Sequence, residues 1–278
     1  MNSRRDFLKL VAAASATGAW RELHALRPAT VVRTTGVQLY TLRTLLEKEF
    51  DRTLAAVAAM GYREVEFAGY YGRTPQQVAA ALSANGLTAP SAHINTWGKP
   101  DVFAASLDAA GIIGHRWVVM PWVLPELRGG AAMWRSIADT LLQAVDPARA
   151  RGARVAYHNH EFEFAAVEGT TPLEILMQSV GDRVDFELDC YWATFANRDP
   201  VAFLRQHPGR VRLLHLKDAK AGPKHEMTSV GDGTIDWKSV LRAADAVGVR
   251  HGFVEHDNPT DPLASVKASI TYLSKLNG

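Results

Sequence analysis

The chain has 278 residues, 47% of them hydrophobic, which is enough for one large domain or two small ones with a full core. Its formal net charge of +2 is too small to predict a nucleic-acid partner or an acidic membrane surface. Cys190 is the only cysteine, which excludes an intrachain disulfide framework and a zinc site built on thiolates.

The N-terminus differs from the rest of the chain. Residues 3–9 (SRRDFLK) match the twin-arginine export pattern, and a mild apolar run over 10–20 is too short to span a bilayer. We therefore predict an export signal and linker over 1–29, cleaved between Ala19 and Ala29. The twin-arginine machinery would carry the folded protein to the periplasm, and no stable membrane anchor is expected. An ordinary amphipathic helix is the alternative.

From residue 30 to 278, short apolar runs alternate with segments of helical spacing that end in Gly. The predicted strands cover 35–40, 64–68, 87–94, 117–122, 154–158, 184–188, 211–216 and 251–255. The predicted helices cover 50–60, 74–86, 102–110, 131–151, 172–180, a stretch that begins at Asp199, 236–247 and 262–276. The segment 218–236 is predicted to be a long loop.

Eight strands alternating with about eight helices predict a single (β/α)8 TIM barrel. An open doubly wound sheet is the competing fold. It would need a glycine-rich phosphate loop after an early strand, and the sequence contains neither G-x-G-x-x-G nor a Walker A motif. The long loop would cover a ligand on the active face.

Carboxylates and imidazoles close the last four predicted strands, at 157–161, 187–189, 215–218 and 255–257. Such groups are costly there unless they serve one site, and the strand ends of a parallel barrel meet around one mouth. We therefore predict that Asp189, His215 and Glu255 bind one divalent ion, Mn²⁺, Co²⁺, Zn²⁺ or Mg²⁺, since carboxylate and imidazole suit these ions. Separate salt bridges are the alternative.

The ligand from the fifth strand is open among His158, His160 and Glu161. His158 and His160 share the same parity, and Glu161 lies just beyond the strand. Any one of the three could bind the ion. The others would orient the substrate or hydrogen-bond behind the ligands.

Other residues at the strand ends are candidates for chemistry and substrate binding. Lys217 has the same parity as His215 and would stabilise an oxyanion, unless it is simply an exposed lysine. Predicted substrate contacts are Gln38, Glu66, His93, Trp122 and Trp192. The first two could bind hydroxyls, His93 could be an acid, a base or a sugar contact, and the indoles could stack on sugar faces. Packing at the barrel rim is the alternative.

From about Gly36 onward the chain resembles the sugar phosphate isomerase/epimerase family, whose members are xylose isomerase-like TIM barrels. The motifs that carry the resemblance are YHNHEFEF at 157–164, ELDCYW at 187–192, HLKD at 215–218, VGDG at 230–233 and VEHD at 254–257. The related endonuclease IV branch fits poorly, because its three-zinc site needs more His and Glu and its substrate needs a basic surface.

The resemblance implies one metal held by Glu, Asp, His and Glu from strands five to eight. The last three map to Asp189, His215 and Glu255. The family usually has Glu-Asn-His at the end of strand five, and this chain has His158-Asn159-His160. Either His158 replaces the Glu, or Glu161 supplies the carboxylate.

We therefore predict a metal-dependent isomerase or epimerase that forms an enediolate by removing a proton next to a carbonyl of a sugar. Glu255, Glu161 or His160 would take the proton. A keto-glycoside lyase or hydratase on the same site is one alternative, and a non-catalytic sugar-binding barrel is another. A homo-oligomer is compatible with the sequence.

Overall fold

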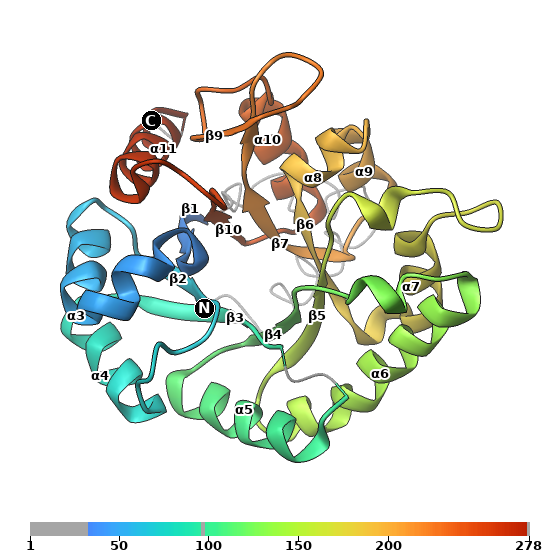
Figure 1. The fold of residues 1–278 in the computed structure, drawn as a ribbon, viewed down its shortest axis with the longest axis horizontal. Coiled ribbons are helices and arrows are strands. Elements are labelled where there is room, and N and C mark those ends of the chain that lie inside the picture. Colours follow the sequence, from blue (N-terminus) through green and yellow to red (C-terminus); the bar gives the residue numbers. More distant parts are fainter. Residues whose placement is uncertain (1–32, 96–97, 277–278) are drawn as a thin grey trace, which may run out of the picture. The chain divides into compact units, whose positions relative to one another are not determined.

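The computed structural model describes residues 33–95 and 98–276. In this part of the chain, parallel strands close into a barrel in the order β1-β10-β7-β6-β5-β4-β3-β2, as Figure 1 shows. The barrel strands are β1 (Arg33–Gln38), β2 (Glu64–Phe67), β3 (Thr88–His93), β4 (Trp117–Met120), β5 (Arg154–His158), β6 (Asp185–Asp189), β7 (Val211–Leu216) and β10 (His251–Val254). The predicted (β/α)8 barrel is confirmed.

Helices surround the barrel and connect its strands (Figure 1). They are α3 (Arg43–Ala59), α4 (Pro75–Ala84), α5 (Pro100–Ile113), α6 (Ala131–Arg149), α7 (Pro172–Val180), α8 (Cys190–Phe195), α9 (Pro200–Gln206), α10 (Trp237–Val247) and α11 (Pro262–Leu276). Short 3₁₀ turns are η1 (Leu39–Leu42), η2 (Pro125–Leu127), η3 (Phe162–Phe164) and η4 (Gly181–Arg183).

Local signals explain most helix starts. Thr74 and Gln77 form a reciprocal capping box at the start of α4. Asp199 caps α9 by accepting from the Val201 N–H, and Asp236 caps α10 by accepting from the Ser239 N–H. The predicted export segment 1–29 lies outside the described residues. Within the described residues, no helix is both long and apolar enough to cross a membrane.

Three elements differ from the prediction. The helix predicted at 50–60 begins earlier, at Arg43, and has a kink at Glu49 (φ −138°, ψ 61°). The six-residue helix α8 is too short to show a helical period, and it starts because Asp189 accepts a hydrogen bond from the Trp192 N–H. The predicted loop 218–236 contains a small antiparallel ribbon, β8 (Asp218–Ala219) and β9 (Met227–Thr228).

The inside of the barrel is filled in layers, because alternate residues of each strand point inward. A small apolar cluster fills the lower interior and consists of Trp117, Val119, Ala156, Leu213 and Phe253. A Cβ at Gly36 would lie 2.5 Å from the Phe253 ring, so this position must be glycine for the ring to fit. Two residues further along β5, β7 and β10, the inward side chains are polar: His158, His215 and Glu255 follow Ala156, Leu213 and Phe253. The site therefore rests on a packed apolar floor.

Asp218 anchors the long loop after β7. Its buried carboxylate accepts hydrogen bonds from the Ala219, Gly231 and Ile235 N–H groups and from the indole N–H of Trp237, at 2.8–3.2 Å. One carboxylate thus satisfies four donors and joins β8, the VGDG turn and the start of α10. A Cβ at Gly233 would collide with this carboxylate.

Replacing Asp218 with Ala should therefore lower the free energy of unfolding by about 3 kcal/mol or more, because several buried donors lose their acceptor. Urea unfolding measures the change. Asp232→Ala, at an exposed aspartate in the same loop, is the matched control. Equal effects of the two substitutions would contradict the anchoring role.

Candidate active site

The carboxyl ends of four adjacent strands bring the predicted ligands together. His158 ends β5, Asp189 ends β6, His215 lies in β7, and Glu255 directly follows β10. Asp189 and His215 are paired in the register of β6 and β7. The side chains of His158, Asp189, His215 and Glu255 are all 0–5% exposed. They converge because alternate residues of each strand point into the barrel.

The atoms that face one another in this cluster fit a divalent ion. Asp189 uses Oδ1 to cap α8, and its buried Oδ2 makes no hydrogen bond in the described part of the chain but lies 3.2 Å from the Lys217 ammonium. His215 Nδ1 likewise has none, although it lies 2.7 Å from Glu255 Oε2 and 3.8 Å from Asp189 Oδ2. Ligand atoms of Asp189, His215 and Glu255 lie within 4.8 Å of one another. Unpartnered buried donor atoms that converge in this way are what a metal would satisfy.

His158 is the strand-five residue that reaches this cluster. Its Nε2 lies 3.9 Å from Asp189 Oδ2. Glu161 and His160 line the pocket instead, and neither belongs to the groups of converging ligand atoms among the described residues. The geometry therefore favours His158 as the fourth ligand over Glu161.

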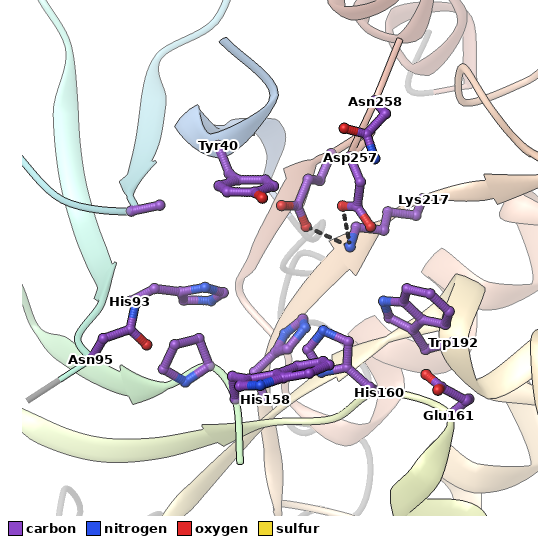
Figure 2. Close-up of a pocket in the computed structure, with 14 residues that line it drawn as sticks. Tyr40, His93, Asn95, His158, His160, Glu161, Trp192, Lys217, Asp257 and Asn258 are labelled. Atoms are coloured by element: carbon purple, nitrogen blue, oxygen red, sulfur yellow. Dashed lines mark ion pairs between the residues drawn. The ribbon is translucent and has the colours of Figure 1, made fainter. Parts of the chain in front are cut away.

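Lys217 balances the carboxylates beside the cluster. Its ammonium lies 2.8 Å from Glu255, 2.9 Å from Asp257 and 3.2 Å from Asp189, as Figure 2 shows in part. Burial alone would lower the pKa of Lys217, but the three carboxylates outweigh it and raise the pKa well above its usual value. Lys217 is therefore a fixed positive charge at neutral pH and points into the mouth, as predicted.

His160 provides an imidazole that is neutral at physiological pH. Burial, and next the charge of Lys217, hold its pKa well below the usual value. Its ring stacks parallel to Phe162 and meets the Trp122 ring edge-on at 4.6 Å between centroids. A neutral histidine fixed by aromatic rings in a pocket can accept a proton.

A pocket of about 460 Å³ lies directly above these groups. In Figure 2, His158 and His160 lie below Lys217 and Asp257, and Trp192 lies beside Glu161. The lining residues are Tyr40, Ala68, His93, Asn95, Pro121, Trp122, His158, His160, Glu161, Trp192, Lys217, Glu255, Asp257 and Asn258. The size and the mixture of aromatic and polar groups are typical of a small-molecule site.

Most of the predicted substrate contacts lie in this pocket. His93, Trp122 and Trp192 line it, whereas Gln38 and Glu66 lie fully buried beneath it. Gln38 donates to Glu66 at 2.7 Å, and Glu66 in turn accepts from Ser91 and His215. Gln38 and Glu66 thus support the ligands from below.

Several residues of the site were not singled out from the sequence. Glu187 lies two residues before Asp189 and so shares its inward parity, a signal that could have identified it. Asp257 and Tyr40 complete the pocket wall. Glu163 is fully buried and accepts hydrogen bonds from the Tyr157 hydroxyl at 2.5 Å and from the His160 N–H at 2.7 Å.

Comparison with known proteins agrees with the fold. The sequence profile of the xylose isomerase-like TIM barrel family matches residues 54–276. The chain belongs to this family. The prediction of a sugar isomerase/epimerase-like enzyme, with a lyase as a possibility, is confirmed at the level of the family.

Relatives of this xylose isomerase-like barrel are known by name and by structure. An inosose dehydratase of Geobacillus thermodenitrificans is 24% identical over 245 residues, which cover 75% of this chain and 82% of the relative. A sugar phosphate isomerase/epimerase from Parabacteroides distasonis shares the fold with a TM-score of 0.77 and 23% identity, over 89% and 95% of the two chains. The IOLI protein, whose structure has a bound zinc atom, has a TM-score of 0.65 and 16% identity, over 87% and 96%.

Glu163 makes the stability of this xylose isomerase-like barrel depend on pH. Burial raises the pKa of its carboxyl to about 8, more than its hydrogen bonds lower it. Since the folded pKa lies above the unfolded one, this carboxyl's contribution to stability is complete at low pH and is lost as the pH rises through 8. Glu163→Gln, which cannot ionise, should gain stability relative to the wild type between pH 5 and pH 8.5.

Urea unfolding at both pH values measures this difference. Glu126→Gln, at an exposed glutamate of η2, is the control and should follow the wild type. A difference between Glu163→Gln and the wild type that stays constant with pH would show that Glu163 ionises normally.

Proposed function

We propose that the protein is a divalent-metal-dependent isomerase or epimerase that removes a proton from the carbon next to a carbonyl of a sugar or cyclic polyol. The observation that carries this proposal is the convergence of two buried ligand atoms that make no hydrogen bond, Asp189 Oδ2 and His215 Nδ1, with Glu255 at the floor of the pocket. His158 would complete the set.

A bound divalent ion would polarise two neighbouring substrate oxygens and make the adjacent C–H acidic. The chain's own residues supply the rest. His160 is neutral and lines the pocket, so it can take the proton. Lys217 stays protonated and stabilises the negative charge that develops on the substrate oxygen. Trp122 and Trp192 offer faces for the apolar side of a sugar ring.

A dehydratase is the second candidate, and the names of the relatives favour it. Several of them are named inosose dehydratase. In this reaction the C–H proton goes to the base, the C–H electron pair forms a carbon–carbon double bond, and the neighbouring hydroxyl leaves with a proton as water. Both candidates share the first step.

The charges of the pocket favour an uncharged sugar over a phosphorylated one. Carboxylates of Glu161, Glu255 and Asp257 line it. Among the described lining residues the one lysine or arginine is Lys217, and three carboxylates already surround it. A phosphate would therefore lie near the three carboxylates that line the pocket, without a lysine or arginine of the described lining that is not already paired.

We also propose that the protein is exported through the twin-arginine route to the periplasm, on the strength of the SRRDFLK pattern at residues 3–9. Cells that express the full sequence should contain the protein in the periplasmic fraction. Cells that express an Arg4→Lys/Arg5→Lys double variant should contain it in the cytoplasmic fraction. The same location for both would argue against this route.

Metal content tests the proposed centre. The purified protein should hold about one divalent ion per chain, and an Asp189→Ala/Glu255→Ala double variant should hold none, because a closed set of ligands is needed for tight binding. Elemental analysis gives the ratio. A double variant at exposed carboxylates, Glu126→Ala/Asp182→Ala, should keep the ion. A metal-free wild type that gains no stability from added Mn²⁺, Co²⁺ or Zn²⁺ would refute the proposal.

His160→Gln tests the assignment of the base. It should lower the rate of deuterium uptake by a keto-sugar in D₂O by about 10²–10⁴-fold, the usual contribution of a general base, with the metal content unchanged. Proton NMR follows the exchange and separates an epimer from a dehydrated product. If Glu161→Gln abolishes exchange and His160→Gln does not, the base is Glu161.

Binding of neutral and phosphorylated forms of one keto-sugar tests the substrate class. Quenching of tryptophan fluorescence should report a Kd about tenfold lower for the neutral form, because the phosphate would lie beside the carboxylates. Glu161→Gln should narrow the difference, and Glu126→Gln should leave it unchanged. Tighter binding of the phosphate ester by the wild type would overturn this part of the proposal.

A further inference from the structure

Two carboxylates, Glu66 of β2 and Glu187 of β6, lie beneath the pocket and next to the candidate ligands. They are 0% and 1% exposed, and neither lines the pocket. Buried carboxylates are retained at a cost in free energy unless they are paired and hydrogen-bonded. Glu66 contacts the imidazole of His215 at 2.7 Å, and Glu187 contacts those of His158 at 3.1 Å and His215 at 3.2 Å.

Glu66 is placed as an acceptor for His215. Its Oε2 lies 2.7 Å from His215 Nε2 and 2.7 Å from the Gln38 amide nitrogen, and its Oε1 accepts from the Ser91 hydroxyl. With both oxygens accepting, Glu66 requires the proton of the His215 ring to be on Nε2. When this ring is neutral, its lone pair is then on Nδ1, the atom that lies 2.7 Å from Glu255 Oε2 and 3.8 Å from Asp189 Oδ2.

Glu187 lies behind His158. Its Oε2 lies 3.1 Å from His158 Nδ1, 2.8 Å from His93 Nε2 and 3.2 Å from His215 Nε2, and its Oε1 has no hydrogen-bond partner in the described part of the chain. A proton on His158 Nδ1 leaves the lone pair on Nε2, which is the nitrogen nearer to Asp189 Oδ2. His215 therefore presents Nδ1 to the cluster, and His158 presents Nε2. In each ring the other nitrogen contacts a carboxylate, that of Glu66 or of Glu187.

We propose that Glu66 and Glu187 are positioning residues for the metal centre: Glu66 fixes the tautomer and orientation of His215, and Glu187 fixes those of His158. This inference rests on the proposed metal-dependent function. Carboxylates behind ligand histidines raise the basicity of the ring and hold it in place, and their loss typically costs metal affinity.

A second metal ion is the competing interpretation, because ligand atoms of His93, His158, Glu187 and His215 also lie within 4.8 Å of one another. Such an ion would take the nitrogens of His158 and His215 that already donate to Glu187 and Glu66. If both ions were bound, each of these rings would have to lose both of its protons. The hydrogen-bonded arrangement needs only neutral rings, so the structure favours it.

The test compares Glu66→Gln and Glu187→Gln with a matched control, Glu163→Gln. All three replace a fully buried glutamate by its isostere, but Glu163 contacts Tyr157 and the His160 backbone instead of a ligand imidazole. Zinc affinity is measured by chelator competition. The two positioning variants should lose about 10–100-fold in affinity, and Glu163→Gln should match the wild type.

Nitrogen-15 NMR of the histidine rings supplies a second readout in the metal-free protein. We expect the wild type to show His215 protonated at Nε2 and His158 at Nδ1, with the first preference lost in Glu66→Gln and the second in Glu187→Gln. A general loss of packing would not select one ring in each variant. Should one variant not fold, the other tests the same idea on its own ring.

Three results would overturn the inference: unchanged tautomers in both variants, a loss of zinc affinity in Glu163→Gln as large as in the others, or two zinc ions per wild-type chain with one lost in Glu187→Gln. The tautomers are read without metal. A wild type that binds no metal but shows the expected tautomers would therefore refute the proposed function and still support the positioning role.

Discussion

Carboxylates and imidazoles inside a barrel need partners, because water cannot reach them to solvate their charge. In this protein Asp189, Glu187, Glu66 and Glu255 are almost fully buried, and each lies within 4 Å of an imidazole or of Lys217. The hydrogen bonds among them satisfy most polar atoms but leave Glu187 Oε1, Asp189 Oδ2 and His215 Nδ1 without a hydrogen bond, and the last two converge with Glu255. The converging atoms define where the chemistry takes place.

The layers of the barrel follow from this constraint. The apolar cluster around Phe253 and Trp117 closes the interior from below, the Glu66 and Glu187 layer orients the imidazoles, and the ligand layer opens into the pocket. Lys217 then limits the negative charge at the top of the site. A rigid floor matters here, because ligand geometry must hold within a fraction of an ångström for tight metal binding.

Two buried carboxylates outside the cluster hold in place the backbone segments that carry pocket residues. Asp218 holds the loop after β7 to the start of α10, and Glu163 holds the backbone of His160 next to β5. Neither contacts the pocket, yet both fix segments that carry pocket residues. In Figure 2, His160 and Lys217 approach the pocket from different strands, so the placement of each depends on its own anchor.

The sequence by itself determined the barrel, since the alternation of apolar runs with glycine-terminated helices leaves few other folds. It also determined that Asp189, His215 and Glu255 point to one mouth, because strand parity and the parallel arrangement depend only on local order. The sequence did not predict three local features. The early start of α3 depends on a kink, the short helix α8 depends on a single cap, and the ribbon in the long loop depends on one buried carboxylate.

Only the tertiary structure decided which strand-five residue reaches the cluster and which nitrogen of each imidazole faces it. His215 and Glu66 are 149 positions apart, and His158 and Glu187 are 29 apart. Sequence spacing cannot place such pairs within hydrogen-bond distance, since barrel closure brings them together. The tautomers, and with them the ligand set, are therefore properties of the closed barrel, because each depends on a carboxylate that a different strand supplies.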